Sequence, residues 1–96
     1  MTVNLIDAVR VVDLDAIWYP GGKHQHVVAV HLADARVHER EDVVQNIRSA
    51  SQGYATKADA RALVRVGACP LCGEEGHLTA ARDGRTVDRL LELPRF

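Results

Sequence analysis

Hydrophobic positions along the chain recur with two different periods. Alternating or β-branched-rich patterns predict four strands, at residues 5–12, 26–32, 59–69 and 77–82. Between the second and third strands, apolar residues from Val43 to Ala50 recur at spacings of three and four, which predicts a helix over residues 39–52. Acidic residues in its first turn and Gly53 after its last turn are typical of the two ends of a helix.

This order predicts an α+β fold of the form β-β-α-β-β, with one helix packed on an antiparallel or mixed sheet. A chain of 96 residues has room for one core, so we expect a single domain over residues 1–96. Pro20-Gly21-Gly22 and Asp83-Gly84 are turn signals. The leucines before Pro94 predict a short helical turn or strand that packs back on the sheet.

The third predicted strand has an inner and an outer face. Small apolar side chains alternate with larger or charged ones, so one face is expected to be buried and consists of Ala62, Val64, Val66 and Ala68. Arg61 and Arg65 flank Leu63 on the other face, which is expected to meet solvent. His31, in the second strand, is expected at the surface.

Composition narrows the class of protein. Hydrophobic residues make up 47% of the chain and charged residues 26%, as in a water-soluble globular domain. Aromatic residues make up only 4%, so the core must be aliphatic. The N-terminus lacks the pattern of a signal peptide and no apolar run is long enough to span a membrane, so we expect a cytoplasmic protein. Arginine outnumbers lysine ten to two, which is typical of GC-rich actinobacteria and their phages.

A metal-binding pattern occupies residues 69–77, between the last two predicted strands. It reads Cys-Pro-Leu-Cys-Gly-Glu-Glu-Gly-His, with two thiols from one turn followed by an imidazole. Zinc prefers four tetrahedral ligands of this kind, so we expect a zinc-binding loop held by Cys69, Cys72 and His77. Gly73 permits the positive φ needed where the loop doubles back, and Gly76 lets the chain close around the ion. Reduced, metal-free thiols and a redox-active pair are the alternatives.

Cys69, Cys72, Gly73, Gly76 and His77 resemble the CCHC zinc knuckle of retroviral nucleocapsid proteins. The resemblance implies a fourth ligand five residues after the histidine, where this chain has Arg82, whose guanidinium stays protonated and cannot bind zinc. Three sources could complete the site. They are Asp83, a second chain in a homodimer, and His24 or His26, whose i, i+2 spacing places them on one face of a strand. We favour His24 or His26, because their loop has no other evident need for two imidazoles.

The C-terminal part carries a second resemblance. His77-Leu78-Thr79, Asp83-Gly84, Asp88 and the run from Leu90 to Pro94 resemble the ending of a family of small bacterial and phage domains of unknown function. The resemblance implies a fold and no activity.

A non-enzymatic binding module with a structural zinc site is the function that these features favour. Its partner is expected to be a protein, because the net charge of −1 offers no basic footprint for nucleic acid and no feature indicates a membrane. An enzyme is not expected, because a zinc deaminase needs a different order of histidine, glutamate and cysteines. The alternative is a nucleic-acid-binding accessory protein that uses the knuckle together with Arg61, Arg65, Arg82 and Arg85.

Overall fold

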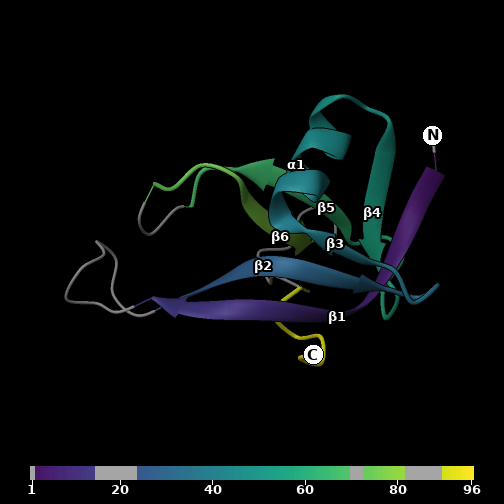
Figure 1. The fold of residues 1–96 in the computed structure, drawn as a ribbon, viewed down its shortest axis with the longest axis horizontal. Helices are drawn as coiled ribbons and strands as arrows, with labels where there is room; N and C mark the ends of the chain where they lie inside the picture. Colours follow the sequence, from purple (N-terminus) through teal and green to yellow (C-terminus); the bar gives the residue numbers. More distant parts are fainter. Residues whose placement is uncertain (1, 15–23, 70–72, 82–89) are drawn as a thin grey trace.

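The computed structural model describes residues 2–14, 24–69, 73–81 and 90–96. These residues form one helix packed on a mixed six-stranded sheet (Figure 1). The elements are β1 (Thr2–Leu14), β2 (His24–Leu32), β3 (Val37–Glu39), α1 (Arg40–Arg48), β4 (Gln52–Thr56), β5 (Leu63–Gly67) and β6 (His77–Ala81). The α+β class is confirmed. The order differs from the predicted one, because two further strands, β3 and β4, flank the helix.

The long strand β1 organises the sheet, whose order is β3-β2-β1-β4-β5-β6. Its first part pairs in parallel with β4, and its remainder pairs antiparallel with β2. A register shift between Ile6 and Ala8 separates the two parts, and Figure 1 shows the strand bending there. At the far end of the β1–β2 pair, Leu14 lies opposite His24.

Helix α1 is shorter than its sequence pattern predicts. It begins at Arg40, directly after β3, with Glu41 and Asp42 in its first turn, and it ends at Arg48. Ala50 takes a positive φ of 56° and donates its backbone N–H to the carbonyl of Ile47. The N–H of Ser51 reaches back to Asn46, which completes a Schellman-type helix end. The predicted helix over 39–52 was therefore wrong at its C-terminus, and Gly53 lies in β4 rather than capping the helix.

The core lies between the sheet, the buried Val43 of α1 and the C-terminal segment. Leu90 and Leu93 are buried there, and the backbone N–H of Val9 donates to the carbonyl of Pro94 at 2.9 Å. The prediction that this segment packs back on the sheet is confirmed. Ala62 and Val64 are buried as expected, whereas Ala68 is exposed because the strand ends at Gly67. The turn signals Pro20-Gly21-Gly22 and Asp83-Gly84 lie outside the described residues.

The sheet curls on itself. Strands β2 and β6 are separated in the sheet order by β1, β4 and β5, yet residues of β2 contact residues of β6. This curvature brings the β5–β6 hairpin to the beginning of β2. In the described part of the chain, no helix is long and apolar enough to cross a membrane.

Candidate metal centre

Two histidines and a cysteine meet where the curled sheet brings β2 to the β5–β6 hairpin. One potential ligand atom from each of His24, His26 and Cys69 lies within 4.8 Å of the other two. His24 and His26 are alternate residues of β2, so both side chains leave the same face of the strand. Their ring centroids are 4.9 Å apart. Cys69 follows the end of β5 at Gly67, and the contact between β2 and the hairpin lets it reach both rings.

The donor set fits a small, borderline-soft cation. Zinc–sulfur bonds of about 2.3 Å and zinc–nitrogen bonds of about 2.0–2.1 Å place tetrahedral ligand atoms about 3.4–3.6 Å apart. The three candidate atoms are therefore within about 1.5 Å of the separations that zinc imposes. His26 and Cys69 are 2% and 3% exposed, so an ion bound here would be shielded from water on the side of these two ligands.

Backbone hydrogen bonds join Cys69 to Gly73 and Glu74. The N–H of Gly73 donates to the carbonyl of Cys69 at 2.7 Å, and the N–H of Cys69 donates to the carbonyl of Glu74 at 2.9 Å. Gly73 has a φ of 76° and Gly76 a φ of 75°, as expected for glycines where the chain doubles back. These contacts bring the backbones of Cys69 and Glu74 together.

His77, the first residue of β6, lies beside the cluster but is not one of the three converging donors. Its ring centroid is 4.9 Å from that of His26, and its Nδ1 is buried. Cys72, the other ligand expected from the sequence, lies outside the described residues. The structure thus joins Cys69 to the two histidines that were expected to complete the site, and it places His77 next to them.

Glu74 contacts the cluster from the hairpin. Its Oε2 lies 3.1 Å from Nδ1 of His26, and its Oε1 lies 3.6 Å from a guanidinium nitrogen of Arg40, the first residue of α1. Burial lowers the pKa of His26 below its ordinary 6.5, although the Glu74 carboxylate opposes this shift. A lowered pKa favours the uncharged imidazole, which is the form that binds metal. No sequence signal pointed to the role of Glu74, because its contact with His26 depends on the curl of the sheet.

The arginines expected to bind nucleic acid are only partly within the described residues. Arg61 and Arg65 are exposed on either side of Leu63, and the backbone N–H of Arg61 donates to the side chain of Asp59. Arg82 and Arg85 lie outside the described residues.

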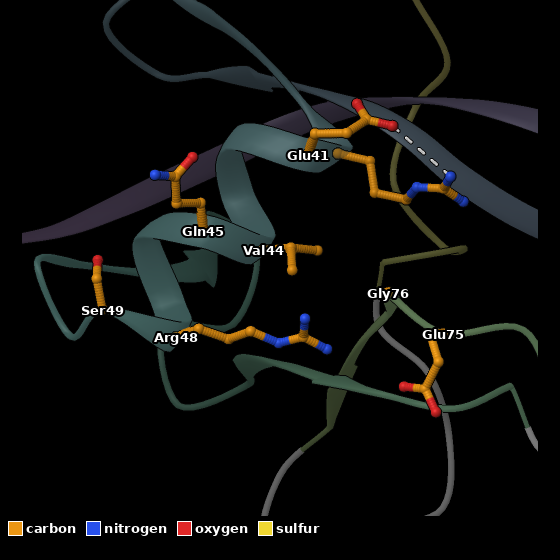
Figure 2. A pocket seen from close by; sticks show the side chains of 8 residues that line it. Glu41, Val44, Gln45, Arg48, Ser49, Glu75 and Gly76 are labelled. Atoms are coloured by element: carbon orange, nitrogen blue, oxygen red, sulfur yellow. Dashed lines mark ion pairs between the residues drawn. The ribbon is translucent and has the colours of Figure 1, made fainter.

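An open pocket of about 600 Å³ lies between α1 and the residues that follow Glu74. Figure 2 shows Val44 facing the pocket from the helix, Arg48 extending beside it, and Glu75 and Gly76 on the opposite side. Arg40 lines the same pocket and also contacts Glu74. Arg40 therefore links the pocket to Glu74, the residue that contacts His26.

Comparisons with protein-family models, with curated proteins and with solved structures find no match for this chain.

Proposed function

We propose that the protein is a small, non-enzymatic binding module whose curled sheet is held together by a structural zinc ion. The observation that carries this proposal is the convergence of His24, His26 and Cys69 from two separate parts of the sheet. The sequence offers Cys72, and the structure His77, as the candidate fourth ligand.

A zinc ion at this position would act as a clamp between β2 and the β5–β6 hairpin. In peptides, structural zinc contributes about 10–16 kcal/mol of apparent binding free energy. The whole stability of a domain of this size is about 5–15 kcal/mol. Zinc binding on this scale is large enough to decide whether the hairpin stays against β2.

Burial of the donors favours a structural ion over a catalytic one. A catalytic zinc keeps one coordination position open to substrate. His26 and Cys69 are almost wholly buried, and none of the three donors lines the described pocket. This arrangement supports the proposal of a binding protein rather than an enzyme.

The outer face of the sheet supports a protein as the partner. Leu5, Ala55 and Leu63 are in register across β1, β4 and β5, so their side chains share a face. Leu5 and Leu63 are 37% and 48% exposed on either side of Ala55, which is fully buried, and Val3, two residues before Leu5, is 49% exposed. Exposed apolar side chains that gather on one face are typical of protein-binding surfaces.

The metal part of the proposal is tested by elemental analysis of untagged protein purified with zinc present. We expect one zinc per chain, and loss of zinc both in Cys69→Ser and in the double variant His24→Ala with His26→Ala. Full zinc content in the double variant would refute the assignment of these ligands. A value near one half per chain would indicate an ion shared between two chains.

The partner is tested by affinity capture, with wild type compared with Leu63→Asp. We expect a captured protein that is lost in the variant, which should keep its zinc. Salt-dependent binding to a random single strand of nucleic acid, without any captured protein, would instead favour the nucleic-acid-binding alternative.

A further inference from the structure

The contacts of Glu74 give it a defined place beside the metal centre. Its carboxylate touches a candidate ligand, His26, with one oxygen and the helix residue Arg40 with the other. The backbone of the same residue accepts a hydrogen bond from Cys69, a second candidate ligand. One residue thus links two candidate ligands and the helix.

We propose that Glu74 is the positioning residue of this metal centre, and that Arg40 holds Glu74 in place from α1. The inference rests on the proposed zinc site and adds to it the residues that orient the ligands.

The chemistry of the His26–Glu74 contact determines which ring nitrogen can bind metal. An ionised carboxylate only accepts hydrogen bonds, so at 3.1 Å the Nδ1 of His26 must be the donor. In a neutral imidazole the lone pair then lies on Nε2, which becomes the ligand atom. A carboxylate that accepts from the second nitrogen fixes the orientation of the ring and makes the ligand nitrogen more basic.

Arg40 restricts Glu74 in turn. The Arg40 side chain is 23% exposed and Glu74 is 43% exposed, so the pair lies at the edge of the buried site. A guanidinium nitrogen of Arg40 also lies 3.7 Å from Oε1 of Glu41, and this ion pair is the dashed line in Figure 2. The guanidinium is shared between two carboxylates and is anchored at the start of the helix. The helix therefore contributes to the metal centre without supplying a ligand.

The chain offers a matched control for each residue. Glu75 is adjacent to Glu74 and lines the pocket, but within the described residues it has no ion pair with His26 or Arg40. Arg48 lies on the same helix as Arg40 and lines the same pocket, but within the described residues it has no ion pair with Glu74.

The test measures zinc affinity by competition with a chelating dye for Glu74→Ala, Glu74→Gln and Arg40→Ala. Removal of a carboxylate that orients a ligand histidine weakens metal binding by about 10–100-fold. We expect this loss for Glu74→Ala, and a smaller loss for Glu74→Gln, whose amide oxygen still accepts from Nδ1. Arg40→Ala should shift affinity in the same direction, whereas Glu75→Gln and Arg48→Ala should stay within about twofold of wild type.

Two further measurements separate positioning from a general effect on folding. The thermal midpoint of metal-free protein should be nearly the same in Glu74→Gln and Glu75→Gln, and saturating zinc should still give the wild-type stoichiometry in Glu74→Gln. Equal zinc affinity in Glu74→Ala and Glu75→Gln would overturn the inference while leaving the zinc site itself in place. Absence of zinc from the wild type would instead overturn the proposed function.

Discussion

The hydroxyl of Tyr54 joins helix α1 to the sheet, and its removal is expected to cost a measurable part of the stability. Tyr54 lies in β4 and is 1% exposed. The side-chain amide of Asn46, in α1, donates to the hydroxyl at 2.9 Å, and the hydroxyl shares a second hydrogen bond of 2.8 Å with Nδ1 of His38, in β3. Tyr54→Phe keeps the ring in the core and removes both hydrogen bonds.

The expected loss follows from these two contacts. A buried hydrogen bond contributes about 1 kcal/mol net, so we expect Tyr54→Phe to lower the free energy of unfolding by about 2 kcal/mol. Asn46 and His38 are half-buried, so in the variant water can partly replace the lost hydrogen bonds. The loss of unfolding free energy should therefore stay below the full penalty for two buried polar groups without hydrogen bonds. For a domain of this length, about 2 kcal/mol corresponds to a fall of about 8–16 °C in the melting temperature.

Urea unfolding in the presence of a metal chelator measures the effect without any contribution from zinc. Asn46→Ala, made alone and together with Tyr54→Phe, forms a double-mutant cycle that isolates the contact between them. The reasoning is wrong if Tyr54→Phe costs less than about 0.5 kcal/mol, or if the two substitutions are simply additive.

Three further results are expected. At zinc concentrations about 100 times the dissociation constant, binding should stabilise wild type by about 2.7 kcal/mol. Calorimetry should show that His26→Ala largely loses this gain, whereas His31→Ala, whose ring contacts Asp7, keeps it. Equal losses in the two variants would argue against the site. Gly73→Ala should cost about 1 kcal/mol because its φ is 76°, whereas Gly67→Ala, with nothing within 4 Å of the added methyl, should change unfolding by less than about 0.5 kcal/mol. Hydrogen bonds from the backbone and side chain of Arg36 hold the pKa of Asp34 below 3.8. Wild type should therefore be more stable than Asp34→Asn above pH 3.8, and urea titrations should show this difference in stability vanish as the pH falls below that value.

Local patterns in the sequence predicted the elements with strong periodicity. The alternation in β1 and β2, the start of the helix and the β5–β6 hairpin follow from side chains that are close in the sequence. The end of the helix was not predictable from local patterns, because Ala50 occupies the left-handed conformation that is usually taken by glycine. A helical pattern that continues to Gln52 conceals the start of β4 at that residue, and Gly53 there resembles a helix cap although it lies in the strand.

The candidate site was predictable only in part. Spacing alone placed His24 and His26 on one face of a strand, and the cysteine motif marked Cys69 as a ligand. Their meeting depends on the curl of the sheet, which arises from long-range pairings such as the parallel register of β1 with β4. The contacts of Glu74 with His26 and Arg40 join three segments far apart in the sequence, and no local pattern encodes them.

The return of residues 94–96 to β1 has a consequence for the kinetics of folding. Val9 exchanges hydrogen bonds with Pro94 and Phe96, so the neighbours of the central strand come from nearly the whole length of the chain. Large loops must close before these pairings add any stability, and proteins dominated by such distant contacts fold in milliseconds to seconds rather than microseconds. Among the described residues, only residues 94–96 pair with Val9 on that side, so before they dock this part of β1 presents a hydrogen-bonding edge to other chains.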